Sequence, residues 1–113
     1  MKNDLDYVKD VLAYALRVKR YAEGGSLETF LATEKTQDAV IRCFEVMGEA
    51  TKRLTPEFRA THPDIPWAKI AGFRDVLIHG YDGIIYRRCW DVIEVDLPGL
   101  IARLEAIAPP EEK

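Results

Sequence analysis

Residues Asp4–Ala22 read DLDYVKDVLAYALRVKRYA, and this stretch decides the fold class. Apolar side chains recur along it every three or four residues, the spacing that gathers them on one face of an α-helix. A second apolar set follows the same spacing and gives the helix another face to bury. We therefore predict a helix that packs on two sides, a second subunit being one candidate neighbour. The two sets are Leu5, Val8, Leu12, Ala15 and Leu16, and Tyr7, Val11, Tyr14, Val18 and Tyr21.

The residues that follow this helix predict further helices and no strand. Gly24-Gly25-Ser26 ends the first helix, and Thr33 is placed to cap a later one. Residues before proline avoid the helical region, so the proline-rich stretch around residue 63 is predicted to be extended. The predicted elements are helices at Leu27–Ala32 and Glu34–Leu54, a short turn from Pro56, a connector at His62–Pro66, a helix from Trp67 to Ile78 or Tyr81, and a last helical segment at Ile84–Ile107.

Together these elements predict an all-α, up-down four-helix-bundle-like domain of four to five helices. The chain has 113 residues, enough for one core and too few for two. We place a single domain at residues 1–108 and a disordered tail at 109–113. Pro98 interrupts the last helix, which predicts a kink or a restart capped by Asp96.

Composition limits the classes of function. The formal net charge is −3, so the basic excess of a general nucleic-acid binder is missing and any RNA contact must come from a local patch. A polar start without a signal peptide, and no apolar run near the ~20 residues that cross a bilayer, predict a cytoplasmic protein with no membrane contact. Cys43 and Cys89 are expected to be reduced core residues. No zinc spacing is present, so neither metal nor cofactor is expected.

The segment Gly72–Tyr81, GFRDVLIHGY, has one physical anomaly. Arg74 falls on an otherwise apolar arc, which is costly unless the guanidinium is paired or lies at a wet cleft. The polar face of the long helix carries Arg42, Glu45, Glu49 and Arg53, and its two acids are candidate partners for Arg74. An ion pair of Arg74 with Glu45 or Glu49 would be structural, or would orient the arginine for chemistry.

His79 lies five positions after Arg74, about 140° around an ideal helix, so the two do not face each other squarely. Three arrangements would bring them together. The helix loosens at Gly80, the arginine side chain bends round, or the site combines residues of two chains. The periodicity does not choose between them.

Arg74–Tyr81 reads R-x4-H-x-Y and resembles the signature of the HepT-like ribonuclease toxins of the HEPN superfamily. The resemblance extends over about Asp4–Leu104. Asp75 departs from it, because asparagine often follows the arginine in these families. Other landmarks similar to the family pattern are Gly48-Glu49-Ala50, Ile65-Pro66-Trp67, Trp90 and Asp96-Leu97-Pro98.

The resemblance implies a HEPN-like fold and a ribonuclease that is toxic to its own cell, with Arg74 and His79 as the catalytic pair. It also implies a partner, a minimal nucleotidyltransferase antitoxin of the MntA type, which uses ATP to add AMP to the motif tyrosine, Tyr81. An AMP group there would place a bulky anion beside the catalytic pair, as a regulatory phosphate does.

These residue types suit cleavage of RNA without a metal ion. Histidine titrates near working pH and transfers protons, while arginine binds two phosphate oxygens with its planar fork. The motif supplies one histidine, and His62 has no obvious partner, so a homodimer would supply acid and base by symmetry. Supporting roles are assigned to Asp75, Glu45 and Glu49, and a possible RNA contact to Arg87 and Arg88, which would otherwise form a solvated basic turn.

Two other functions remain open from the sequence. The chain could be a non-catalytic helical subunit that binds substrate for, or regulates, a minimal nucleotidyltransferase. It could also be a purely structural dimerisation bundle, in which Arg74 and His79 affect stability alone.

Overall fold

The computed structural model of the chain describes residues 1–79 and 83–109, and within them it is all-helical, which confirms the predicted class. Pro56–Thr61 completes a short helix, and the last predicted segment is divided, so the structure adds helices to the expected set. Residues 110–113 of the expected tail lie outside the described residues. The elements are α1 (Asp4–Ala22), α2 (Leu27–Ala32), α3 (Glu34–Lys52), α4 (Pro56–Thr61), α5 (Trp67–His79), α6 (Gly83–Asp91), the π-helical turn η1 (Val92–Asp96) and α7 (Leu97–Ile107).

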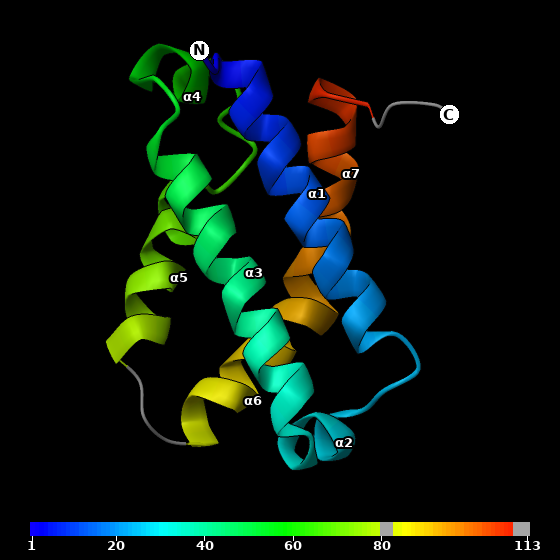
Figure 1. The fold of residues 1–113 in the computed structure, drawn as a ribbon. Helices are drawn as coiled ribbons and strands as arrows, with labels where there is room; N and C mark the ends of the chain where they lie inside the picture. The colour runs from blue at the N-terminus through cyan, green and yellow to red at the C-terminus, as the bar shows by residue number, and fades with distance from the viewer. Residues whose placement is uncertain (80–82, 110–113) are drawn as a thin grey trace.

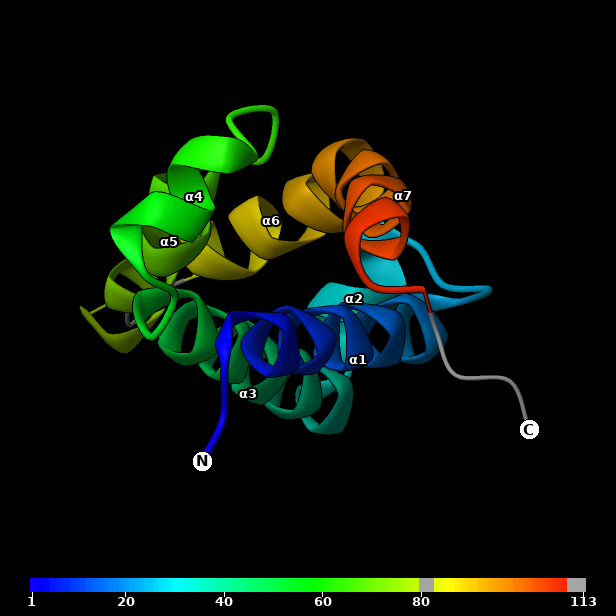
Figure 2. The same cartoon turned by 90° about the horizontal axis from the view of Figure 1, so that it is seen from above.

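The long segments alternate in direction, as the up-down prediction requires (Figure 1). Helices α1 and α3 form a central antiparallel pair. Helix α5 packs on α3, and α7 packs on α1. Viewed from above, α6 crosses from the α5 side of the molecule to the α7 side (Figure 2).

Helix α1 is buried on two sides, as predicted, and its neighbours belong to the same chain. Val8 and Leu12 of the first apolar set are buried, and so are Val11 and Val18 of the second. Helices α3 and α7 pack against α1, which accounts for both faces without another subunit. The members left exposed at either end are Leu5 and Tyr21.

A clasp joins the start of α1 to the start of α4. The Asp4 carboxylate accepts hydrogen bonds from the backbone N–H of Thr55 at 2.9 Å and from its hydroxyl at 2.8 Å. The same hydroxyl accepts from the N–H of Phe58 and so caps α4, whose first residue is Pro56. This corner is thus held by one carboxylate from a segment 51 residues away.

The C-terminal segment changes helix type where a proline kink was expected. The π-helical turn begins at Val92, and the N–H of Leu97 donates to the carbonyl of Val92, five residues back. Pro98 has no N–H to donate to residue 94, and its ring would crowd that carbonyl, so a wider turn relieves both problems. Pro98 then sits in the first turn of α7. The predicted cap is wrong in detail, because the Asp96 side chain makes no capping hydrogen bond. Nor does the Thr33 side chain at the start of α3.

Candidate functional site

Helix α5 carries the candidate residues, and its first turn is fixed by two buried side chains. Ile65 and Trp67 are buried, and the Trp67 indole N–H donates to the carbonyl of His62 at 3.1 Å. The His62 ring packs on Phe58, with 4.8 Å between ring centroids. His62 therefore belongs to the connector before α5.

Gly48 sets the distance between α3 and α5. A Cβ atom at this position would lie 2.7 Å from the Cβ of Arg74 and 3.2 Å from the carbonyl oxygen of Ile70. Any side chain at residue 48 would push the two helices apart. A glycine inside α3 costs about 1 kcal/mol relative to alanine, and here it permits the contact that positions Arg74.

Arg74 is paired and partly solvated. Its Nε lies 3.2 Å from Oε2 of Glu49, and its Nη1 lies 3.5 Å from Oδ1 of Asp75. The side chain is 30% exposed, which removes the cost expected for an arginine on an apolar arc. Lys52 also reaches Asp75, at 3.5 Å. Of the two acids proposed as partners, the structure selects Glu49.

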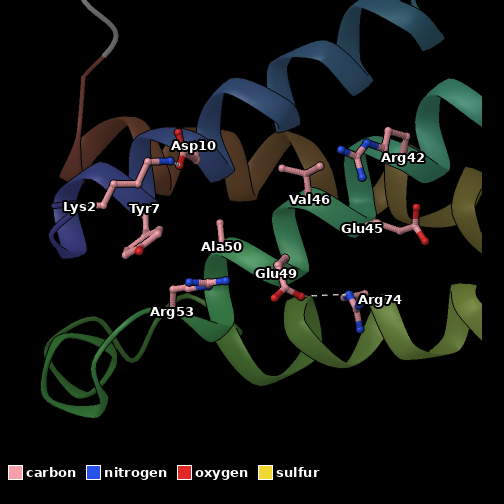
Figure 3. Close-up of a pocket in the computed structure, with 10 residues that line it drawn as sticks. All are labelled: Lys2, Tyr7, Asp10, Arg42, Glu45, Val46, Glu49, Ala50, Arg53 and Arg74. Carbon is pink, nitrogen blue, oxygen red and sulfur yellow. Dashed lines mark hydrogen bonds and ion pairs between the residues drawn. The ribbon is translucent and has the colours of Figure 1, made fainter.

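Arg74 lies at one edge of an open groove of about 500 Å³ between the α1 and α3 surfaces (Figure 3). Glu45 lines this groove although it does not pair with Arg74. The lining carries four cationic and three anionic side chains, a net charge of +1 in a chain whose net charge is −3. The lining is thus mixed in charge, with a small excess of cations relative to the rest of the chain. The groove is lined by Lys2, Tyr7, Asp10, Arg42, Glu45, Val46, Glu49, Ala50, Arg53 and Arg74.

Arg42 and Arg53 were read from the sequence as part of a polar face and were not assigned to the site. Both line the groove with Arg74. The signal was their place on the same face of α3 as Glu45 and Glu49. A face with that pattern is indistinguishable from a solvated one until the helix opposite it is known.

The structure separates Arg88 from this groove. Both Arg87 and Arg88 are exposed on α6, and Arg88 lines a different cavity, between α5 and α7. Neither lines the groove at Arg74.

Helix α5 continues through His79, but the side chain of His79 and the whole of Tyr81 lie outside the described residues. The loosening expected at Gly80 stays a prediction, because the described part of α5 ends at His79. No loosening occurs before residue 79, so the helix itself keeps His79 about 140° from Arg74. Gly80 also lies outside the described residues.

Neither cysteine offers a nucleophile. Both thiols are buried and unpaired, and burial raises the pKa of Cys43 above its ordinary value and that of Cys89 to about 12. Both are therefore neutral near pH 7. Within residues 1–79 and 83–109, no three His, Cys, Asp or Glu side chains could together hold a metal ion. In the same part of the chain, no helix combines the length and apolar character that spanning a membrane requires.

Comparison with known proteins supplies a family. Residues 11–107 match the model of the family described as Ribonuclease HepT-like. "Probable ribonuclease HepT" of Thermococcus cleftensis is 37% identical over 102 residues, which cover 90% of this chain and 93% of that protein. A protein of Caldanaerobacter subterraneus subsp. tengcongensis, named as a candidate RNase, is 36% identical over 112 residues, 99% of this chain and 100% of its own. One from Methanocaldococcus jannaschii, also named as a candidate RNase, is 38% identical over 101 residues, 89% of this chain and 84% of its own. No solved structure gives a significant match.

Proposed function

Given that this chain belongs to the HepT-like ribonuclease family, and is thereby an RNA-cleaving enzyme, we propose that it is the toxin of a toxin–antitoxin pair. In this proposal it cuts RNA internally without a metal ion, and Arg74 and His79 of the R-x4-H-x-Y motif are its catalytic pair.

One observation carries the proposal. Arg74 is the motif residue whose side chain is described, and it lies at the edge of an open groove of mixed charge, with Glu49 held against its Nε at 3.2 Å. The ion pair alone would fit a structural role, and it is the open groove beside it that favours a role for Arg74 in binding a phosphate. The pairing at Nε fixes the plane of the guanidinium, whose fork then matches two oxygens of a phosphate.

The chemistry needs three groups. The 2′-hydroxyl of RNA attacks the adjacent phosphorus while a base removes its proton. An acid protonates the 5′-oxygen that leaves, and a cation stabilises the charge that develops on the phosphorane oxygens. His79 is suited to proton transfer, and Arg74 to charge stabilisation. The products are a 2′,3′-cyclic phosphate and a 5′-hydroxyl end.

A homodimer would complete the set of groups. Each chain contributes one motif histidine, and a two-fold axis beside the motif would bring a second His79 to the same cleft as acid or base. The proposal rests on this count of groups. The apolar faces of α1 no longer support it, because they are buried within the chain.

Regulation would act at Tyr81. A nucleotidyltransferase of the MntA type would transfer AMP from ATP to the Tyr81 hydroxyl, with release of pyrophosphate. The added phosphodiester is an anion, and beside Arg74 it would compete with RNA for the guanidinium. Incubation with the cognate transferase and ATP is expected to add the mass of one or more AMP units to wild type and none to Tyr81→Phe. An unmodified wild-type protein in the presence of an active transferase would remove this part of the proposal.

The catalytic assignment is tested by cleavage of a labelled RNA. We expect Arg74→Gln and His79→Ala each to lower the rate by about 100-fold or more, the scale for loss of a charge-stabilising donor or a proton-transfer group. Arg20→Gln removes an exposed arginine outside the groove and is expected to leave the rate unchanged. Chelation with EDTA should also have no effect. Equal rates in wild type and His79→Ala would refute the assignment and leave a binding subunit as the better description.

A further inference from the structure

A second cavity, of about 620 Å³, lies between α5 and the segment formed by η1 and α7. It shares no lining residue with the groove at Arg74. Its size falls within the usual range for small-molecule sites, roughly 300–1,000 Å³. Apolar side chains of several elements line it, among them Phe44 of α3, Phe73 of α5 and Leu100 of α7.

Gly72 is the first feature that favours this cavity as a binding site. This glycine lies within α5, where it costs about 1 kcal/mol relative to alanine. At Gly48 the same cost is explained by a neighbouring helix. At Gly72 an added Cβ would meet no atom within 4 Å, so packing within the chain does not explain the missing side chain. Gly72 lines the cavity, and a bare backbone there lets a bound molecule approach the helix closely.

The charge around the cavity is the second sign. Lys69, Arg88 and Arg103 line it together with one acid, Asp96, which gives a net charge of +2 against −3 for the whole chain. In the described part of the chain, the one ion pair made by these three cations is between Arg103 and Asp64, at 3.9 Å. Such a weak, half-exposed contact leaves the cations able to bind an anion.

Apolar walls and a doubly positive rim together define the ligand chemistry. A carboxylate carries one negative charge, whereas a phosphate monoester carries about −1.5 to −2 at pH 7 and three acceptor oxygens. Phe44 and Phe73 pack edge to face at 5.2 Å, and Phe73 is partly buried beside the open space at Gly72. An aromatic wall of this kind favours a flat body over a flexible chain.

We propose that this cavity binds a small phosphorylated molecule with a flat apolar body, the chemical class of a nucleoside monophosphate. The body lies against Phe73 and the bare backbone of Gly72, and the phosphate binds among Lys69, Arg88 and Arg103. The site is distinct from the Arg74 groove, so it is separable from the catalytic proposal.

Isothermal titration calorimetry of the full chain with AMP tests the site, with adenosine, inorganic phosphate and laurate as the other arms. We expect AMP to bind at least about tenfold more tightly than any of the three, because only AMP supplies both halves of the ligand. Gly72→Leu fills the space beside the helix and should abolish AMP binding. The double variant Lys69→Gln, Arg88→Gln should weaken it by about tenfold or more without adding bulk.

Two further variants locate the binding. Lys35→Gln, an exposed lysine outside the cavity, is expected to bind AMP as wild type does. Arg74→Gln is expected to do the same, because Arg74 lines the other groove. Loss of binding in Arg74→Gln with retention in Gly72→Leu would overturn the proposal.

Other results would overturn it as well. They are no heat of binding for AMP at millimolar concentration, tighter binding of laurate than of AMP, or unchanged AMP affinity in the Lys69, Arg88 double variant. A change of oligomeric state in Gly72→Leu, measured by light scattering, would identify the cavity as a subunit interface and would also contradict the proposal.

Discussion

At the scale of single residues, the contact between Glu49 and Arg74 positions the arginine side chain more than it stabilises the fold. Glu49 is 50% exposed, and ion pairs exposed to this degree contribute about 0–1 kcal/mol to stability. The carboxylate meets Nε, the guanidinium nitrogen closest to the helix. Among the described residues, Asp75 is the other acidic partner, at Nη1. Glu49 thus restricts how the arginine fork is turned toward the groove.

Glu49→Gln is therefore expected to act on catalysis and not on folding. With RNA as substrate, kcat should fall about tenfold because the fork is less well positioned, while KM should not rise, because a negative charge beside the substrate phosphate has been removed. The free energy of unfolding should change by less than about 1 kcal/mol.

Glu45→Gln is the matched control. Glu45 lines the same groove on the same helix but makes no ion pair with Arg74, so its kcat should remain that of wild type. Equal kcat in the two variants would show that Glu49 does not position the arginine.

The sequence identified Arg74 because a charged residue on an apolar arc demands an explanation. It could not choose between Glu45 and Glu49, which lie four positions apart on one face of α3. The choice depends on the register of α5 against α3, and that register follows from the close approach at Gly48. The spacing of apolar residues along either helix does not reveal such a tertiary contact.

At the scale of helices, two glycines in α3 and α5 have opposite surroundings and give a matched test. Gly48→Ala should destabilise the protein by about 1–3 kcal/mol, because the clash with Arg74 and Ile70 outweighs the better helix propensity of alanine. Gly72→Ala should stabilise it by up to about 1 kcal/mol, because its Cβ enters open space.

Urea denaturation of the two variants beside wild type measures both effects. The same sign of change at both positions would contradict this account of how α3 and α5 pack.

Element boundaries were largely predictable where local signals set them. The predicted spans of α1 and α2 are confirmed, because caps and glycines at their ends act within the local sequence. The interruption near Pro98 was predicted as well, but its π-helical form was not. Proline shows where an α-helix must be disturbed, whereas packing of the whole segment determines how the disturbance is accommodated.

At the scale of the whole molecule, the bundle and its up-down order followed from short connections between amphipathic helices. The sequence did not show which neighbour buries the second apolar face of α1. An apolar stripe on a helix can be covered by another helix of the same chain or by a partner subunit. In the structure, α3 and α7 cover the two stripes of α1. The proposed homodimer therefore needs a test that does not depend on those stripes.

Mixing wild type with one inactive variant provides that test. If one cleft needs His79 of both chains as acid and base, then equal amounts of wild type and His79→Ala, unfolded and refolded together, should give about a quarter of the activity of the same total amount of wild type. Half of the random dimers are then mixed and lack one of the two histidines, so the quarter that is wild type in both chains is the active part. Activity near one half, with mixed dimers demonstrated by a tag on one variant, would place each catalytic set within a single chain.

The clasp between Asp4 and Thr55 has a practical consequence for handling this protein. The carboxylate that fixes the corner before α4 comes one residue after Asn3, the capping residue of α1. A bulky fusion or an affinity sequence attached immediately upstream would compete with both interactions. Purification handles for the experiments above are better placed at the opposite terminus, or separated from Asn3 by a flexible spacer.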